Sequence, residues 1–260
     1  MLTARAQRTL DRIDGSTLDE MRALRDETER FMLRYKFGMD EVNTKLSILR
    51  DEFSQAHAYN PIEHISSRLK SLDSVVDKMR RKGVEPSFEA IRETVTDIAG
   101  VRVTCSFVSD AYRIAELLTA QEDVRVIRVK DYIAEPKANG YQSPHLIVEV
   151  PVFLSTGAHP VCVEVQIRTI AMDFWASLEH KIYYKFDRDV PEALLGELRE
   201  AALAANALDV KMERLHDEVA ALGGVVGADD GVIDAQDIGR SELPDALLRM
   251  IGTVRSRETL

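Results

Sequence analysis

Two carboxylate residues stand in stretches of alternating polar and apolar sequence, where they are placed to support metal-dependent chemistry. Asp97 opens the run "DIAGVRVTCSFVS", and Glu164 lies inside "HPVCVEVQIRT". Because side chains on a strand alternate between its two faces, Glu164 is expected to share a face with Gln166 and Arg168, opposite a row of branched apolar residues. Proteins commonly hold Mg²⁺ beside a nucleotide with one or two carboxylates, and phosphate oxygens complete the coordination. Asp97 and Glu164 therefore indicate a magnesium–nucleotide site.

Cationic and aromatic side chains accompany these carboxylates. The segment "KANGYQSPH" places Lys137, Tyr141 and His145 at intervals of four residues, across a loop between two strand-like runs. Cations of this kind neutralise the charge that develops during phosphoryl transfer. The tyrosine ring offers a flat face on which a base can stack. Further cations lie on the preceding strand and on a helix expected before the sheet: Arg128, Lys130, Arg68 and Lys70.

Each of these features also has a purely structural interpretation. A half-exposed antiparallel sheet carries polar residues such as Glu164, Gln166 and Arg168 on its outer face. Asn139-Gly140 is a common hairpin turn, although a turn can also bind a ligand. Neither a Walker A nor a GxGxxG pattern occurs, so the sequence indicates neither a P-loop nor a Rossmann site.

The composition is that of an acidic globular protein. The chain has 260 residues and a formal net charge of −10, with 45% hydrophobic and 30% charged residues. An acidic balance disfavours stable nucleic-acid binding. No apolar run approaches the roughly 20 residues of a membrane span, and the N-terminus lacks the apolar core of a secretory signal. Cys105 and Cys162 are expected as buried free thiols, which suits a cytoplasmic protein.

Helices are predicted on the N-terminal side of the sheet. Residues 16–58 have helical spacing, and Gly38 predicts a break near 37–39 that would divide them into two helices. Residues 60–83 are interpreted as one further helix. Asn60 is its expected N-cap, Pro61 its first residue and Gly83 its C-terminal cap.

Beyond residue 97 the sequence alternates in the manner of strands. We expect an α+β fold with a mixed sheet of four or five strands and helical flanks at both ends. A short helix, capped by Ser109 or Asp110, is expected to follow the first of these strands. The strand-like runs begin at residues 97, 123, 145 and 159; they are followed by helices at 170–186 and 191–222, a glycine-rich linker at 223–239 and a short helix at 241–252.

Four segments together resemble the synthetase domain of the RelA/SpoT-type alarmone enzymes, and in particular the small single-domain alarmone synthetases. They are "HISSRLKSLDSVVDKMRRKG", "TDIAGVRV", "VKDYIAEPKANGYQSPHLIVEVPVF" and "VEVQIRTIAMDFWASLEHKIYYKF". The resemblance implies a nucleotidyltransferase-like core over residues 61–190, with helical extensions at 1–60 and 191–260. It implies transfer of the β,γ-pyrophosphoryl group of ATP to the ribose 3′-hydroxyl of GDP or GTP, with Mg²⁺ as cofactor and a homotetrameric assembly. The products would be AMP and the alarmones ppGpp and pppGpp of the stringent response.

The resemblance also implies roles for individual residues. Asp97 and Glu164 would be the catalytic residues and the metal ligands, and Glu164 would also activate the attacking hydroxyl. Tyr141 would stack on guanine. The residues implied at ATP are Arg68, Lys70, Arg102 and Lys130, and those implied at GDP or GTP are Arg128, Lys137, Asn139, Tyr141, His145, Gln166 and Arg168.

Alternative functions remain open at this point. The acceptor could be an adenosine nucleotide or the 3′ end of a tRNA, or the protein could be a non-catalytic nucleotide sensor, although the presence of both Asp97 and Glu164 argues against a sensor. Pro144 stands where the family often has a larger hydrophobic or aromatic residue, which would affect acceptor preference. His216-Asp217 lacks further histidine ligands and is interpreted as a surface pair, so no alarmone hydrolysis is expected.

Overall fold

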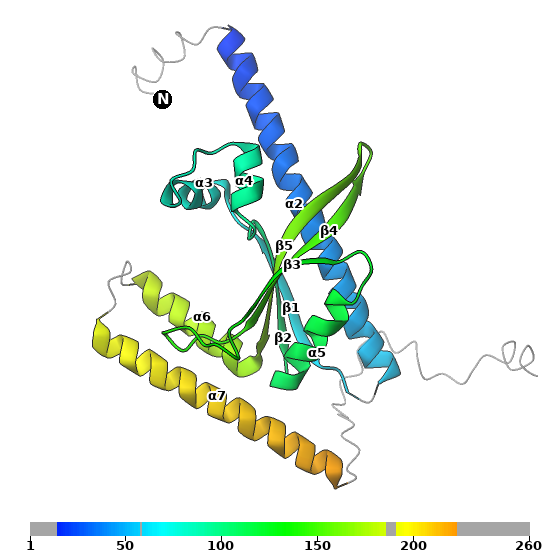
Figure 1. Ribbon diagram of the computed structural model, residues 1–260, viewed down its shortest axis with the longest axis vertical. Helices are drawn as coiled ribbons and strands as arrows, with labels where there is room; N and C mark the ends of the chain where they lie inside the picture. The colour runs from blue at the N-terminus through cyan, green and yellow to red at the C-terminus, as the bar shows by residue number, and fades with distance from the viewer. Residues whose placement is uncertain (1–14, 58, 186–190, 223–260) are drawn as a thin grey trace, which may run out of the picture.

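The computed structural model describes residues 15–57, 59–185 and 191–222, and Figure 1 shows how its elements are arranged. Within these residues five strands form one sheet in the order β1-β2-β5-β4-β3, and six helices surround it. The predicted α+β architecture with a mixed sheet is therefore confirmed. In chain order the elements are α2 (Gly15–Ala56), β1 (Ile62–Leu69), α3 (Leu72–Arg81), α4 (Phe88–Thr94), β2 (Ala99–Cys105), α5 (Val108–Thr119), β3 (Arg125–Asp131), β4 (Pro144–Leu154), β5 (Gly157–Thr169), α6 (Ile170–Lys185) and α7 (Glu192–Ala221).

The central strand β5 separates an apolar face of the sheet from a polar one. It runs parallel to β2 and antiparallel to β4, while β1 and β3 form the edges. Its valines and Ile167 are buried, whereas the alternate residues Glu164 and Gln166 point to the opposite face. The alternation predicted for this strand is confirmed. The polar face therefore carries the candidate site residues Glu164 and Gln166.

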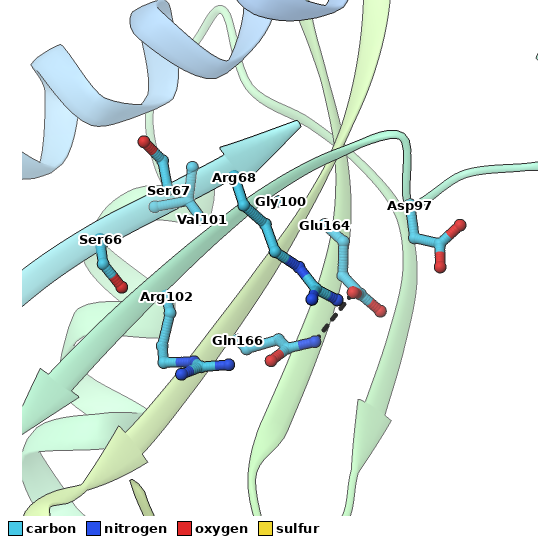
Figure 2. Close-up of a pocket in the computed structure, with 9 residues that line it drawn as sticks. All are labelled: Ser66, Ser67, Arg68, Asp97, Gly100, Val101, Arg102, Glu164 and Gln166. Atoms are coloured by element: carbon cyan, nitrogen blue, oxygen red, sulfur yellow. Dashed lines mark hydrogen bonds between the residues drawn. The ribbon is translucent and has the colours of Figure 1, made fainter. Parts of the chain in front are cut away.

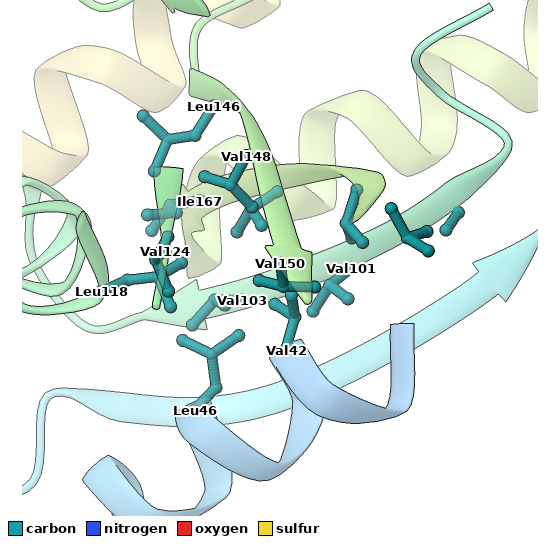
Figure 3. Packing of buried hydrophobic residues seen from close by; sticks show 14 of the residues in the cluster. Val42, Leu46, Val101, Val103, Leu118, Val124, Leu146, Val148, Val150 and Ile167 are labelled. Atoms are coloured by element: carbon teal, nitrogen blue, oxygen red, sulfur yellow. The ribbon is translucent and has the colours of Figure 1, made fainter. Parts of the chain in front are cut away.

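Helices α2 and α5 cover the apolar face (Figure 1). Figure 3 shows Val42 and Leu46 of α2 packed near Val101 and Val103 of β2. All four side chains are almost completely buried. Because burying one such side chain stabilises a fold by about 1.5–3 kcal/mol, this layer fixes α2 firmly against the sheet.

Residues 16–58 do not form two helices, because α2 continues without a break from Gly15 to Ala56. Gly38 marks a close approach between elements. A Cβ atom at Gly38 would lie only 2.6 Å from Cγ1 of Val161 on β5. The glycine therefore lets the helix backbone lie directly on the central strand, and the predicted break near 37–39 is wrong.

The single helix predicted over residues 60–83 is also wrong, because this segment forms the edge strand β1 and then the helix α3. Asn60 does not cap a helix; its Oδ1 accepts a hydrogen bond from the backbone N–H of Ile62 (3.0 Å). Ser71 is the N-cap of α3, and its hydroxyl accepts from the N–H of Ser74. Gly83, with φ of +68°, follows the end of α3 as predicted.

This correction moves two candidate ATP-binding residues onto the sheet. Arg68 lies on β1, where its Cα pairs with that of Gly100 on β2. Lys70 follows directly after the strand, and its backbone N–H donates to the carbonyl of Ile98 (2.8 Å). Both residues are therefore positioned by strand pairing and not by a helix.

The remaining elements agree closely with the predicted ones. The strands predicted from residues 97, 123, 145 and 159 are β2, β3, β4 and β5, and the helices at 170–186 and 191–222 are α6 and α7. Helix α4 was not predicted. The N-cap of α5 is Phe107, whose N–H donates to the carboxylate of Asp110, so the prediction of Ser109 or Asp110 as the cap is wrong. The linker at 223–239 and the helix at 241–252 lie outside the described residues.

Two predictions from composition were also tested by the structure. Cys105 is buried and Cys162 half-buried, and neither forms a disulfide. In the part of the chain that the structure describes, every helix is too short or too polar to cross a membrane.

Two helical glycines, one in close contact with a strand and one in open space, give a first testable prediction. Gly196 lies in α7 with open space where a side chain would stand, so Gly196→Ala should raise the free energy of unfolding by about 0.4–1 kcal/mol. Gly38→Ala should instead lower it by about 1–3 kcal/mol, because the added methyl collides with Val161. Urea denaturation followed by circular dichroism measures both. Equal stabilisation by the two changes would show that α2 does not contact β5 at Gly38.

Candidate active site

Two rows of side chains cross the polar face of the sheet. In the first row the register pairs Arg68 with Gly100, and Gly100 with Glu164. Because Gly100 has no side chain, the space between Arg68 and Glu164 stays open. The second row runs beside it, from β1 to β3, through Ser66, Arg102, Gln166, His145 and Lys130.

A cavity opens on this face and brings together the two carboxylates that the sequence singled out. Figure 2 shows Arg68, Arg102, Glu164 and Gln166 on adjacent strands, with Asp97 on the loop that leads into β2. The predicted proximity of Asp97 and Glu164 is therefore seen in the fold. The residues that line the cavity are Ser66, Ser67, Arg68, Asp97, Gly100, Val101, Arg102, Glu164 and Gln166.

Asp97 is held by two lysines. Nζ of Lys70 lies 2.6 Å from one carboxylate oxygen, and Nζ of Lys78 lies 2.8 Å from the other. Burial acts to raise the pKa of Asp97, but the hydrogen bonds from Lys70 and Lys78 outweigh it and hold this pKa below its ordinary value. Asp97 is therefore ionised at neutral pH, with two cations beside it. Lys78 was missed in the sequence, because its place on α3 became apparent only once β1 was separated from that helix.

Glu164 is the second ionised carboxylate. Nε2 of Gln166 donates to its Oε2 (2.9 Å), and Nδ1 of His145 lies 3.4 Å from its Oε1. Burial and the negative charge of Asp97 act to raise the pKa of Glu164, while His145 and Gln166 lower it, and the net shift is downward. Gln166 therefore holds the carboxylate of Glu164 in position.

Arg168 joins the carboxylate region to the loop that precedes β4. One of its terminal nitrogens donates to Asp173 of α6 (2.8 Å), and the other donates to the hydroxyl of Tyr141 (2.9 Å) and to Oε1 of Gln166 (3.0 Å). Arg102 lies 3.3 Å from the same Asp173 oxygen. Asp173, which the sequence reasoning missed, therefore bridges the two arginines.

The two arginines retain unused hydrogen-bonding capacity. Within the described residues, the Nε atoms of Arg102 and Arg168 are buried and have no hydrogen-bond partner. Burial and the nearby charge of Arg168 lower the pKa of Arg102 from its ordinary value, although Asp173 opposes this shift. Buried donors are nearly always satisfied in folded proteins. Arg102 lines the open cavity, and its positive charge suits an anionic ligand there.

Tyr141 lies beneath the arginine and histidine side chains and is only 8% exposed. Its hydroxyl lies 2.6 Å from Nε2 of His145. The ammonium group of Lys137 lies 4.5 Å from the centres of both the Tyr141 and Tyr132 rings. Tyr141 therefore contacts both of the other predicted acceptor residues, Lys137 and His145. Tyr132 belongs to the same group and was missed, because it lies at the end of a strand-like run.

The Asn139-Gly140 pair forms the predicted turn. The N–H of Gly140 donates to the carbonyl of Lys137 (2.8 Å), and Gly140 has φ of +90°, which favours glycine. Oδ1 of Asn139 accepts from the N–H of Tyr141, and its Nδ2 donates to Glu179 of α6 (3.0 Å). The interpretation as a turn is therefore correct, although the turn lies within the loop of residues 132–143 and does not join β3 to β4 directly. The same turn also aims Lys137 and Tyr141 at the polar face of the sheet.

The other candidates lie farther from the cavity. Arg128 and Lys130 occupy the polar face of edge strand β3, where both are exposed, and neither lines the cavity. Pro144 is buried at the first position of β4, a place where a strand accepts proline. His216 is half-buried against Phe107, with ring centres 4.5 Å apart, so the prediction of a surface His-Asp pair is wrong for His216.

The donor set fits a magnesium ion that is completed by its substrate. Asp97 and Glu164 are both ionised and both face one cavity, which supplies the hard oxygen ligands that Mg²⁺ takes. Among the described residues no cluster of three or more His, Cys, Asp or Glu side chains provides a complete protein cage for a metal. Further ligands would have to come from phosphate oxygens and water.

Comparison with known proteins places this site in a family. The family model described as "Region found in RelA / SpoT proteins" matches residues 67–189, from the end of β1 to beyond α6. A relative from Bacillus subtilis, GTP pyrophosphokinase YwaC, is 50% identical over 202 residues, which are 78% of this chain and 96% of that protein.

Solved structures agree with this match. The small alarmone synthetase 1 from Bacillus subtilis, bound to its product pppGpp, is 39% identical with a TM-score of 0.71; the match covers 75% of this chain and 99% of that one. A crystal structure of the same synthetase bound to AMPCPP is 35% identical with a TM-score of 0.64, and covers 75% and 98%. Since one relative is matched over nearly its whole length at half of all positions, the chain belongs to the RelA/SpoT family.

Proposed function

We propose that the protein is a GTP/GDP pyrophosphokinase, which transfers the β,γ-pyrophosphoryl group of ATP to the ribose 3′-hydroxyl of GDP or GTP. The observation that carries this proposal is the single cavity that contains both Asp97 and Glu164 and is also lined by Arg68 and Arg102. It is supported by the relative named as a GTP pyrophosphokinase and by the related synthetase bound to pppGpp. The products would be AMP and ppGpp or pppGpp.

The reaction asks mainly for positioning and charge neutralisation. The 3′-hydroxyl oxygen attacks the β-phosphorus of ATP, and the bond from this phosphorus to the oxygen bridging the α-phosphate breaks, so that AMP leaves. The proton of the hydroxyl passes to the carboxylate of Glu164, which is ionised and lies at the floor of the cavity. Fixed cations then stabilise the charge spread over the phosphoryl oxygens.

We assign ATP to the side of the cavity formed by β1 and α3. Arg68 and Arg102 line the cavity, and Lys70 and Lys78 stand behind Asp97. Both ammonium groups are within reach of a triphosphate placed at Asp97. Mg²⁺, which we propose as the cofactor held by Asp97 and Glu164, would neutralise phosphate charge and draw the reacting oxygens into line. The AMPCPP-bound relative supports a nucleotide donor here.

We assign the acceptor to the side formed by β4, β5 and the loop of residues 132–143. His145 and Arg168 present cations or hydrogen-bond donors there, and Tyr141 presents its ring. Lys137 lies over that ring, so stacking of guanine on Tyr141 requires this flexible side chain to swing away. Once displaced, its ammonium group is free to pair with the 5′-phosphates of the acceptor.

A direct assay tests the reaction and the role of Glu164 together. Wild-type protein with Mg²⁺ and labelled ATP should convert GDP or GTP to the 3′-pyrophosphorylated product and release AMP. Glu164→Gln should lower kcat at least 100-fold, because proton transfer of this kind contributes about 10²–10⁴-fold, while nucleotide dissociation constants change little. Glu116→Gln, an exposed carboxylate on α5, serves as the matched control and should behave as wild type.

Other outcomes of this assay have defined meanings. Transfer to AMP, ADP, ATP or tRNA in place of guanosine nucleotides would overturn the assigned acceptor. Absence of transfer to any acceptor would favour a nucleotide sensor. Full activity of Glu164→Gln would remove Glu164 from the mechanism. We also expect no breakdown of added pppGpp by this chain, and EDTA should stop the transfer and Mg²⁺ restore it.

Tyr141 can be tested without emptying its buried site. Tyr141→Leu fills the same cluster but lacks an aromatic face, so the KM for GDP or GTP should rise about 5- to 100-fold, since base stacking contributes about 1–3 kcal/mol. Tyr141→Phe keeps the ring and should retain most of this affinity. The KM for ATP should stay within twofold in both variants. An unchanged acceptor KM in Tyr141→Leu would rule out stacking.

We further propose that the chain assembles with copies of itself into a cytoplasmic homotetramer. In the described part of the chain, α7 carries an exposed apolar row with spacings of four and three residues, the pattern by which helices pack against one another. Single exposed apolar residues need no explanation, but a row of five does. Its members are Leu208, Met212, Leu215 and Val219 of α7 and Leu222, which caps the end of the helix.

Light scattering at micromolar concentration tests the assembly. Wild-type protein should give a mass near four times that of the chain. Met212→Glu together with Leu215→Glu should lower it, because two charges would enter the proposed helix interface. Lys211→Ala, an exposed neighbour outside the row, should leave the mass unchanged. A monomeric wild-type protein would contradict the proposal.

A further inference from the structure

The loop of residues 132–143 has little support from the sheet at its tip. Its turn is closed by the hydrogen bond from Gly140 to Lys137, and the N–H of Lys137 donates to the carbonyl of Tyr141 (3.1 Å). Residues 134–138 are exposed. The other contacts of the tip are with helices that follow the sheet in sequence. Whatever fixes these contacts also fixes Lys137 and Tyr141.

Helix α7 touches the tip directly at two neighbouring positions. Nε of Arg199 donates to the carbonyl oxygen of Ala138 (3.0 Å). A Cβ atom at Gly140 would lie 2.5 Å from Cβ of Ala202 and 3.7 Å from Cα of Arg199. The loop backbone therefore lies against the helix, and the small side chain of Ala202, which is 7% exposed, sets the distance between them.

The same part of α7 covers the ring of Tyr141. Tyr141, Trp175, Leu198 and Ala202 belong to a small apolar cluster that is separate from the main core. The indole N–H of Trp175 donates to the carbonyl of Leu198 (2.9 Å), which joins α6 to α7. The loop, Tyr141 and the N-terminal half of α7 therefore pack together as one unit.

The rest of α7 is anchored to the body of the protein away from the cavity. Asp209 is buried and accepts from the hydroxyl of Thr169 (2.6 Å), and Glu213 accepts from the N–H of Ser109 (2.9 Å). No residue of the described α7 lines the cavity that contains Asp97 and Glu164. A change at the loop contact should therefore affect the acceptor loop without altering the donor side.

We infer that Arg199 and Ala202 are positioning residues for the acceptor nucleotide, acting through the loop of residues 132–143. Arg199 ties the carbonyl of Ala138 to the helix, and Ala202 provides the flat contact for Gly140. Together they hold Lys137 and Tyr141 where a guanosine nucleotide can meet them. The identity of the acceptor in this inference rests on the proposed function. The docking of the loop on α7 is independent of that function.

Steady-state kinetics with two variants and two controls test the inference. Arg199→Ala should raise the KM for GDP or GTP about tenfold, the effect of losing one hydrogen bond from a charged donor, and leave the KM for ATP within twofold. Ala202→Leu should raise the acceptor KM to a similar extent with the KM for ATP again within twofold, because the larger side chain would push Gly140 and the loop away from α7. Arg199→Lys, which keeps a donor, should restore part of the affinity. The controls are Arg214→Ala and Ala201→Leu, exposed positions on the same helix that should match wild type.

A second readout does not depend on activity. Trp175 is the single tryptophan of the chain and lies in the cluster between the loop and α7. Release of the loop should admit water, so the emission of Trp175 should shift to longer wavelength in Arg199→Ala but not in Arg214→Ala. Circular dichroism should show that helix content is retained.

The outcomes separate the two proposals. If wild-type protein transfers to no guanosine nucleotide but Trp175 emission shifts as expected, the proposed function fails and the docking stands. If wild-type protein is active while Arg199→Ala and Ala202→Leu keep the wild-type acceptor KM, the positioning role is refuted. An equal rise in the KM values for ATP and acceptor, with lower thermal stability, would also refute it by showing a general structural role.

Discussion

The structure depends on the central strand β5, which is paired along both edges and is apolar on one face and polar on the other. Because β5 is hydrogen-bonded to β2 and to β4, a shift of one residue would exchange its faces. Val163 and Val165 would then enter the polar cavity, and Glu164 would be buried in the core without a partner, at a cost of several kcal/mol. The apolar core therefore fixes the position of Glu164. Through the register it also fixes Arg102 and His145.

The sequence predicted the inner strands because they alternate, and it failed where alternation was interrupted. In β1, Ile62 pairs with Cys105 and Ile65 with Val103, so four residues on β1 match three on β2. This bulge produces the spacing of three and then four, up to Leu69, that is typical of a helix. Only the paired partner distinguishes the two structures. Gly38 was misread for a similar reason, because its role lies in contact with Val161 on a distant strand.

The candidate site was predictable to the extent that its residues lie on alternating strands or in a recognisable turn. Glu164, Gln166 and Arg168 could be predicted from the alternation of their strand. The other candidate residues were predicted from the resemblance of the sequence to a known family. Residues that act through distant contacts left no local signal. Lys78 binds the carboxylate of Asp97 from α3, and Asp173 joins two arginines from α6, so neither role is visible without the tertiary fold.

Helix α7 gives the extension beyond the sheet a definite physical role. Its 30 residues form one continuous helix, so its two halves cannot move independently without breaking backbone hydrogen bonds. The N-terminal half lies against the loop that holds Tyr141, and the C-terminal half carries the apolar row from Leu208 to Leu222. A partner helix on that row would restrain the whole of α7. If the chain assembles as proposed, the interface between copies and the acceptor loop are therefore mechanically joined, because one rigid element forms part of both.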